Sequence, residues 1–184
     1  MPPFYIMLIG SGEYLMKKNE RKTNRLTILG LGNIILGDEG FGVHFVRRFS
    51  ERYHLPDDVL ILDGGTLGYK LLDAVCSCET LIVIDVLKLE DKPGSIYRFE
   101  KKDMALYLPP PTSAHEVQFP DVLLQAEMLD ECPDVIFLCI IPETYGDVDL
   151  VMTEIMEERF DAMEGFLLKE LAEQGIAAMR KSRA

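Results

Sequence analysis

The sequence lacks two features that would assign it to large classes of proteins. No apolar run reaches the roughly 18 residues that a membrane-spanning helix needs, and the apolar segment 4–9 is too short, and lacks the basic leader, for a secretory signal. Positive charge is scarce, because 19 Lys and Arg stand against 31 Asp and Glu, for a net charge of -12. Nucleic acids are bound largely by neutralising phosphates with Lys and Arg. We therefore expect neither a membrane nor a nucleic acid as partner.

Cysteine is also scarce, and its spacing does not indicate a disulfide framework or a Cys-x-x-Cys pair. Cys139 lies inside an apolar run, which predicts a place in the core. Cys76 and Cys78 are interpreted as structural thiols, with metal binding as the alternative. Free thiols suit a reducing compartment, so the sequence predicts a cytoplasmic protein.

The length of 184 residues fits a single domain. Residues 1–24 are interpreted as a flexible N-terminal lead, because the segment 17–25 is basic and polar. Residues 25–184 then form one domain. A monomer is expected, since the sequence shows neither a heptad pattern nor an obvious exposed strand edge that would pair with another chain.

Apolar runs alternate with segments of helical periodicity along the chain. Buried strands are predicted at 26–31, 59–62, 81–84 and 135–141, with an edge strand at 95–99. Helices are predicted from about residue 39, at 67–75, at 121–129 and over 149–179, and three consecutive prolines predict a loop at 108–115. This alternation predicts an α/β fold, a three-layer sandwich with a mostly parallel sheet and helices on both faces.

Three segments follow the carboxyl ends of predicted strands, where open α/β sheets bind their ligands. They are the glycine-rich segment 30–40, the run Asp63-Gly64-Gly65-Thr66, and Asp85. Asp85 ends an apolar strand, a place where an unpaired charge is costly. These segments are therefore the candidates for a functional site.

A dinucleotide site is the first alternative for the glycine-rich segment. Gly30 and Gly32 begin the Rossmann fingerprint, but Ile35 stands where the third glycine belongs. Asp38 and Glu39 would also place negative charge beside a pyrophosphate. Stabilisation by the helix dipole is a simpler explanation for both acids, and a cation site is a further one for Glu39.

A cation site would bring together Glu39, Asp85 and His115. His115 lies in the proline-rich loop, whereas His44 and His54 are assigned to packing or the surface. Two carboxylates and one imidazole, with positions open for water or substrate, suit zinc, nickel or a similar ion.

Together these segments resemble the hydrogenase maturation endopeptidase family. The resemblance is carried by the run 28–43 and by Asp63-Gly64-Gly65-Thr66, Ile84-Asp85, Ser113-Ala114-His115-Glu116 and Ile141-Pro142-Glu143. These signals occur in order between about residues 26 and 180. The chain departs from some relatives at residues 116–120, which lack a glycine, and the N-terminal lead has no counterpart in the family.

The resemblance implies a twisted five-stranded sheet and an aspartic-type endopeptidase that activates a nickel–iron hydrogenase. The partner would be the large-subunit precursor, which loses a short C-terminal extension after nickel insertion. Glu39, Asp85 and His115 would bind the precursor's own nickel, a site that zinc or cadmium could also occupy. The loop of residues 63–66 would recognise the substrate.

The catalytic group is left open by the sequence. Glu39, Asp85 or the metal could activate water, and no serine or cysteine in these loops sits beside a basic partner as a covalent nucleophile would. A non-catalytic, metal-binding maturation chaperone that docks on the same precursor is the alternative function.

Overall fold

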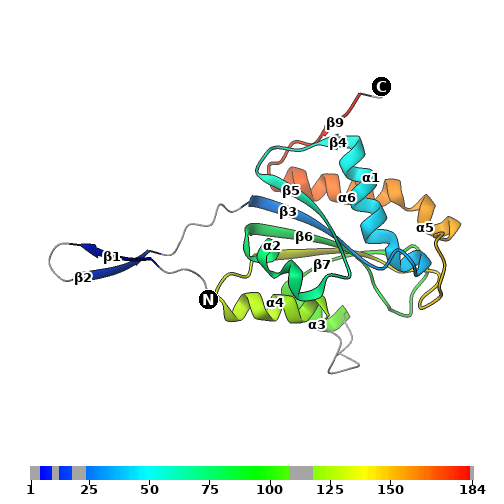
Figure 1. Cartoon of the computed structure of the whole chain (residues 1–184). Helices are drawn as coiled ribbons and strands as arrows, with labels where there is room; N and C mark the ends of the chain where they lie inside the picture. The colour runs from blue at the N-terminus through cyan, green and yellow to red at the C-terminus, as the bar shows by residue number, and fades with distance from the viewer. Residues whose placement is uncertain (1–4, 10–12, 18–23, 108–117, 183–184) are drawn as a thin grey trace.

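A five-stranded sheet forms the centre of the molecule in the computed structural model, which describes residues 5–9, 13–17, 24–107 and 118–182 (Figure 1). The strands lie in the order β5 (Val59–Gly65), β3 (Asn24–Leu31), β6 (Cys78–Val86), β8 (Asp134–Ile140) and β7 (Ile96–Glu100). β3 pairs in parallel with β5 and β6, β6 pairs in parallel with β8, and β7 is antiparallel to β8. The predicted mostly parallel sheet and its predicted edge strand are confirmed, and the structure adds that this edge strand is antiparallel.

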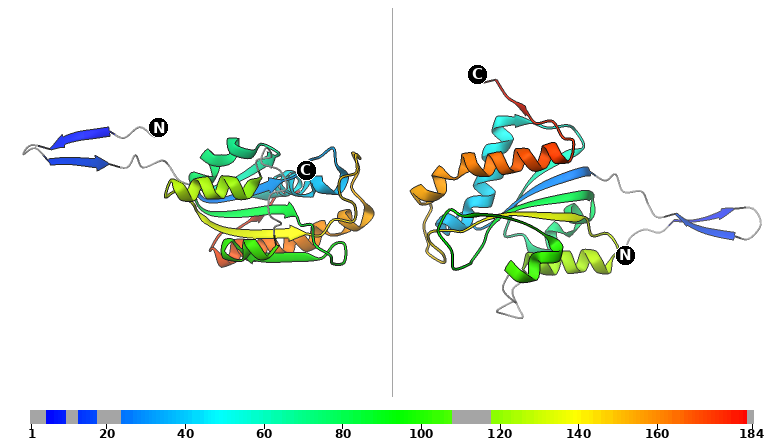
Figure 2. Two further views of the ribbon diagram at one scale, coloured as in Figure 1. Left: turned by 90° about the horizontal axis from the view of Figure 1, so that it is seen from below. Right: turned by 180° about the vertical axis from the view of Figure 1, so that it is seen from behind.

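Helices cover both faces of this sheet, as Figure 2 shows. One face carries α1 (Phe41–Arg52) and α6 (Phe160–Glu173), and the other carries α2 (Leu72–Cys76) and α4 (Phe119–Met128). Two shorter helices, α3 (Met104–Tyr107) and α5 (Glu154–Glu158), connect these elements. The predicted three-layer α/β sandwich is therefore confirmed.

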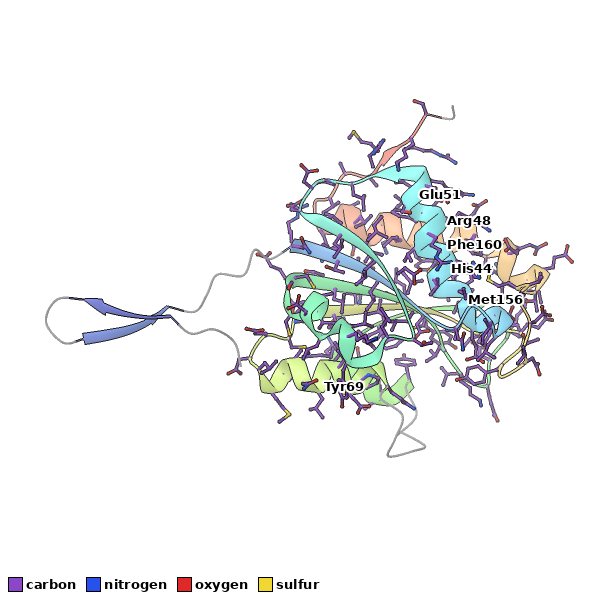
Figure 3. All side chains as sticks on the ribbon, viewed as in Figure 1. His44, Arg48, Glu51, Tyr69, Met156 and Phe160 are labelled. Atoms are coloured by element: carbon purple, nitrogen blue, oxygen red, sulfur yellow. The ribbon has the colours of Figure 1, made fainter. Side chains whose placement is uncertain are left out.

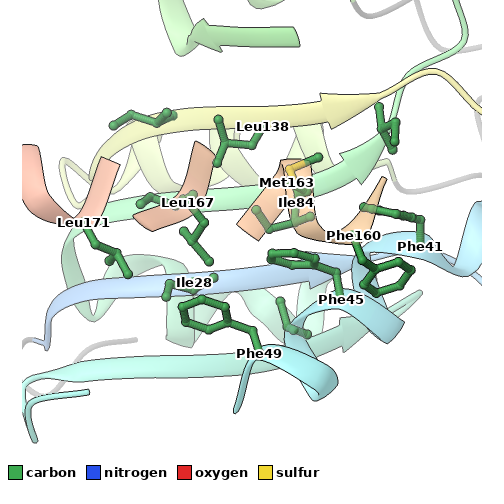
Figure 4. Close-up of a cluster of buried hydrophobic side chains, with 14 of the residues drawn as sticks. Ile28, Phe41, Phe45, Phe49, Ile84, Leu138, Phe160, Met163, Leu167 and Leu171 are labelled. Atoms are coloured by element: carbon green, nitrogen blue, oxygen red, sulfur yellow. The ribbon is translucent and has the colours of Figure 1, made fainter. Parts of the chain in front are cut away.

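Aromatic side chains at helical spacing form the core between α1, α6 and the sheet (Figure 4). Phe41, Phe45 and Phe49 follow one face of α1 and are each at most 2% exposed. Phe160 packs against this row, with its ring centroid 4.8 Å from that of Phe41 and 6.0 Å from that of Phe45. The periodicity that predicted the helix thus also predicted its buried face.

The polar side of α1 faces α5 and the start of α6. His44, Arg48 and Glu51 lie in a row along the helix, beside Met156 and Phe160 (Figure 3). The Arg48 guanidinium lies 3.8 Å from the centroid of the Phe160 ring and donates to Glu157 at 3.0 Å. This contact holds the C-terminal helices against α1.

Gly42 allows α1 to approach the sheet closely. A Cβ atom at this position would lie 2.2 Å from the carbonyl oxygen of Ile84 and 2.3 Å from that of Leu31. The dinucleotide fingerprint needs such a close-packing glycine at position 35. In this chain the close-packing glycine comes later, at position 42, because a 3-10 turn, Gly37–Gly40, lies between β3 and α1.

The three cysteines packed on the α2 and α4 face are core residues. Cys76, Cys78 and Cys139 are buried, and the four cysteines, all within the described residues, form no disulfide. Burial raises the pKa of the Cys78 thiol to about 11. A thiol that stays protonated is a poor metal ligand, which favours the structural interpretation of Cys78.

The helix predicted over 149–179 is wrong at both ends. The helical segment begins at Glu154, and Met179–Arg180 forms a short strand, β9, that pairs antiparallel with β4 (Tyr53–His54). Residues before Glu154 are held in hydrogen bonds to the loop after β3, which leaves them unavailable for a helix. The segment predicted as one helix at 67–75 is a 3-10 turn, Gly68–Leu71, followed by α2. The predicted proline-rich loop lies outside the described residues.

The N-terminal lead contains an element that the sequence analysis did not predict. β1 (Tyr5–Ile9) and β2 (Glu13–Lys17) pair as a two-stranded antiparallel sheet, drawn apart from the α/β domain in Figure 1. The flexibility of this lead stays a prediction. Among the described helices, none combines the length and the apolar character required to cross a bilayer.

Candidate active site

A cavity of about 380 Å³ lies at the carboxyl ends of the parallel strands. Its walls come from the loops after β3, β5 and β6, from the first turn of α4, and from the loop after β8, residues 141–153, which we call the β8–α5 loop. Polar or charged side chains reach it from Asn33, Glu39, Thr66, Asp85, Lys88, Gln118 and Tyr145. A mostly apolar cavity with a few convergent polar groups is the usual form of a ligand site. Its position is the one that the strand-end rule predicted.

Glu39 reaches this cavity because the chain folds back on itself at Gly32. Gly32 has φ +133°, and a Cβ atom there would lie 1.9 Å from the carbonyl oxygen of Glu39. The same carbonyl accepts a hydrogen bond from the Asn33 N–H at 3.0 Å. The Glu39 carboxylate accepts from the Gly146 N–H at 2.6 Å. Glycine at position 32 is thus a requirement of the turn that presents Glu39.

Asp85 is the second-last residue of β6 and also lines the cavity. Its carboxylate accepts from the Val86 N–H at 2.8 Å. The pKa of Asp85 is raised to about 7, chiefly by burial and to a smaller extent by the nearby charge of Glu39, against the Val86 hydrogen bond that lowers it. A carboxylate that is costly to ionise and that faces a second carboxylate is stabilised by a bound cation. The structure therefore brings Glu39 and Asp85 together in a setting that fits a metal ion.

Cys139 is the neighbour of Asp85 across β6 and β8, and it also lines the cavity. Burial, together with the charge of Asp85, raises the pKa of its thiol well above the ordinary value. The reactive form of cysteine is the thiolate. Cys139 therefore does not have the properties of a covalent nucleophile.

His115, the third predicted ligand, lies outside the described residues. Within the described ranges no three His, Cys, Asp or Glu side chains gather as a metal cluster. Gln118 lines the cavity, and the three Cα-to-Cα steps from Gln118 to His115 can span roughly 10 Å. Chain length therefore permits His115 to reach the cavity, and its role as a ligand stays a prediction. His44 and His54 do not line the cavity, in agreement with their assignment to packing or the surface.

The predicted substrate loop, residues 63–66, divides into two parts. Gly65 and Thr66 line the cavity, whereas Asp63 and Gly64 do not. The Asp63 carboxylate accepts from Arg47 Nε at 2.8 Å and from the Gly65 N–H at 3.1 Å. Asp63 thus holds the loop through contacts outside the cavity, and Gly65 and Thr66 are the residues that a substrate could touch.

Asp38 is the site residue that the sequence analysis missed. Its side chain is fully buried and accepts four hydrogen bonds from the β8–α5 loop. The donors are the N–H groups of Glu143, Thr144 and Thr153, at 2.9, 3.0 and 2.8 Å, and the Thr153 hydroxyl, at 3.1 Å. Asp38 lies in the 3-10 turn before α1, and the helix-dipole explanation does not account for these four hydrogen bonds. Asp38 instead ties the β8–α5 loop to the turn that carries Glu39.

The raised pKa of Asp85 predicts a pH-dependent stability difference in the metal-free protein. The folded state binds the Asp85 proton more tightly than the unfolded chain, so ionisation of Asp85 costs stability progressively between about pH 4 and pH 7. Asp85→Asn removes this cost and retains an oxygen for the Val86 N–H. We expect its Tm in chelator to exceed that of the wild type by a few degrees at pH 8, and the gap to shrink to less than half at pH 5. Thermal melts at both pH values measure the gap, and an equal gap at both would contradict the raised pKa.

Comparison with known proteins relates this arrangement to one family. The family model described as "Hydrogenase maturation protease" matches residues 43–170. The chain is 32% identical over 161 residues to the hydrogenase expression/formation protein HupD of Bradyrhizobium diazoefficiens, across 86% of this chain and 84% of that protein. It is 32% identical over 157 residues to the hydrogenase 2 maturation protease of Escherichia coli, across 84% of this chain and 95% of that protein.

Solved structures give the same relationship. The hydrogenase maturating endopeptidase HybD from E. coli superposes with a TM-score of 0.80 at 31% identity, covering 87% of this chain and 99% of that one. The NiFe hydrogenase maturation protease HycI from Thermococcus kodakarensis superposes with a TM-score of 0.65 over 81% of this chain and 93% of that one. Its identity of 22% supports a common fold alone.

Proposed function

The chain belongs to the hydrogenase maturation protease family and is an endopeptidase, and from this premise we propose that it removes the C-terminal extension of a nickel–iron hydrogenase large-subunit precursor after nickel insertion. We further propose that Glu39, Asp85 and His115 recognise the nickel of the loaded precursor. The observation that carries the second proposal is the meeting of Glu39 and Asp85 in one cavity, where the charge of Glu39 helps to raise the pKa of buried Asp85.

Nickel enters this proposal as part of the substrate. Bound to both the precursor and the three ligands, it supplies a fixed positive charge that anchors the scissile bond beside the cavity. Zinc or cadmium, which suit similar ligands, could occupy the same residues in its place. Loss of the extension would release the precursor from the site.

Hydrolysis requires a group that takes a proton from water. The water oxygen bonds to the peptide carbonyl carbon, the C–N bond breaks, and the departing nitrogen gains a proton. Asp85 and Glu39 are the candidates for the general base, and the metal is the alternative means of activating the water. The protonated thiol of Cys139 supports an aspartic-type mechanism over a cysteine-type one.

We also propose that the protein acts as a monomer in the cytoplasm. The four cysteines form no disulfide in the part of the chain that the structure describes, which fits a reducing compartment. The acidic composition, with a net charge of -12, keeps such a protein dispersed. Neither a nucleic acid nor a membrane is expected as a partner.

Incubation with a nickel-loaded large-subunit precursor tests the function. We expect the precursor to lose the mass of its C-terminal extension, and the nickel-free precursor to keep its full mass, because the metal identifies the loaded substrate. Intact-mass spectrometry measures both. Equal cleavage of the two forms would show that the protein does not recognise nickel. Tight binding with no loss of mass would favour a maturation chaperone.

A further inference from the structure

Exposed apolar side chains gather at one edge of the cavity mouth. Three lie on the β8–α5 loop and are among the most exposed large apolar residues described: Val148 at 83%, Leu150 at 75% and Val151 at 71%. Ile35, at 51%, comes from the loop after β3. We call Ile34, Ile35, Tyr145, Val148, Leu150 and Val151 the rim patch. Clustered exposed apolar residues of this kind mark interaction surfaces more often than isolated ones do.

The two segments of the rim patch lie side by side although they are far apart in the sequence. The Gly37 N–H donates to the carbonyl oxygen of Asp149 at 2.7 Å, and the Asp149 N–H donates to that of Ile35 at 3.2 Å. These bonds make Leu36 and Asp149 partners in a parallel bridge. The bridge brings Ile35 next to the strip that carries Val148 and Leu150.

The rim patch is continuous with the candidate active site. Tyr145 belongs to the patch and also lines the cavity, where Lys88 Nζ lies 4.4 Å from the centroid of its ring. Gly146, the next residue, donates to Glu39. A protein resting on the patch would therefore also cover the mouth of the cavity.

The β8–α5 loop is held in place before any partner arrives. The four hydrogen bonds to buried Asp38 and the two to the loop after β3 fix it at both ends and at its middle. A surface that is already ordered loses little conformational entropy on binding. The chain therefore stabilises an exposed apolar loop in one conformation, as a docking surface requires.

The size of the cavity indicates what rests on the rim patch. A volume of about 380 Å³ accepts a short chain segment and excludes a folded protein, so the body of a precursor whose C-terminal end enters the cavity must lie against the rim. Exposed acidic residues, Glu143, Asp147 and Asp149, border the patch. They oppose an anionic membrane surface and favour a protein partner with apolar side chains flanked by Lys or Arg.

We propose that the rim patch is the docking surface for the folded body of the large-subunit precursor. This proposal rests on the proposed function. It separates two contributions to specificity: the cavity selects the metal and the cleavage segment, and the rim patch selects the protein that carries them.

The double variant Val148→Ser/Leu150→Ser tests this surface, because both side chains point to solvent and their loss leaves the fold intact. We expect its Kd and KM for the nickel-loaded precursor to rise by about 10-fold, since two apolar contacts are removed from an interface. kcat at saturating precursor and the Tm should match the wild type. Met128→Ser is the matched control, since Met128 is 79% exposed and lies at the end of α4 away from the cavity; it should change none of these values.

Each pattern of results decides the proposal. If the wild type processes the precursor and the double variant has an unchanged KM, the rim patch is not the docking surface, and the proposed function stands. If binding depends on the rim patch but no mass is lost, the docking surface stands and the proteolytic function fails. If the wild type neither binds nor cleaves, both fail. If analytical ultracentrifugation shows a wild-type dimer that the double variant lacks, with precursor affinity unchanged, the patch joins two copies of this chain and the proposal is wrong.

Discussion

Replacing Glu39 by glutamine, or Asp85 by asparagine, is expected to slow processing of the nickel-loaded precursor by at least roughly 100-fold. Both substitutions keep the size of the side chain and remove its charge, so the cavity loses half of the paired negative charge that fits a cation. Intact-mass time courses of the precursor measure the rate. The same preparations give a Tm that shows whether the variant is folded.

The two variants also separate binding from chemistry. A residue that only holds nickel should raise Kd for the loaded precursor, whereas a general base should lower kcat with Kd nearly unchanged. Glu51→Gln is the matched control, because Glu51 is an exposed carboxylate near the end of α1 that does not line the cavity; its rate should equal that of the wild type. If Glu39→Gln and His115→Ala both process the precursor at the wild-type rate, the proposed ligand set is wrong.

The layers of the fold could be predicted from the sequence because local patterns determine them. Continuous apolar runs indicated the four parallel strands, and the phenylalanine spacing on α1 indicated which face it buries. The last third of the chain was less predictable. Its apolar periodicity resembles that of one long helix. However, backbone hydrogen bonds join residue 149 to residues 35–37, and the helical segment begins only at Glu154. No local signal reports a partner more than a hundred residues away.

The residues of the candidate site also divide into those that the sequence predicted and those that it did not. Glu39 and Asp85 were predicted because each follows a strand, and the carboxyl ends of parallel strands share one rim. The helix dipole was the explanation offered for Asp38, because the sequence shows that Asp38 precedes a helix. The sequence does not show the four hydrogen-bond donors that its carboxylate contacts. The ion pair of Asp63 was also missed, because its partner Arg47 lies on another element. Residues whose role is to hold a second segment were the ones that the sequence could not identify.

Asp38→Asn is expected to lower the free energy of unfolding by about 2–4 kcal/mol and to loosen the β8–α5 loop. Four donors converge on the carboxylate of Asp38, and the amide group of asparagine would turn a donor of its own toward some of them. Denaturant unfolding measures the first effect, and hydrogen exchange at residues 143–153 measures the second. Thr153→Val removes only the hydroxyl donor and should cost about 1 kcal/mol. Unchanged exchange in the Asp38 variant would contradict its role as the anchor of the loop.

The Asp38 variant also tests how the loop and the rim patch act together. If Asp38 positions the loop for docking, Asp38→Asn should raise KM for the precursor, as Val148→Ser/Leu150→Ser does. Combining the two should then raise KM by less than the product of the separate effects, because both remove the same interaction. A purely structural role for Asp38 predicts instead that the two effects multiply. The coupling between a buried carboxylate and exposed apolar side chains thus distinguishes a loop that is held for a partner from one that is merely folded.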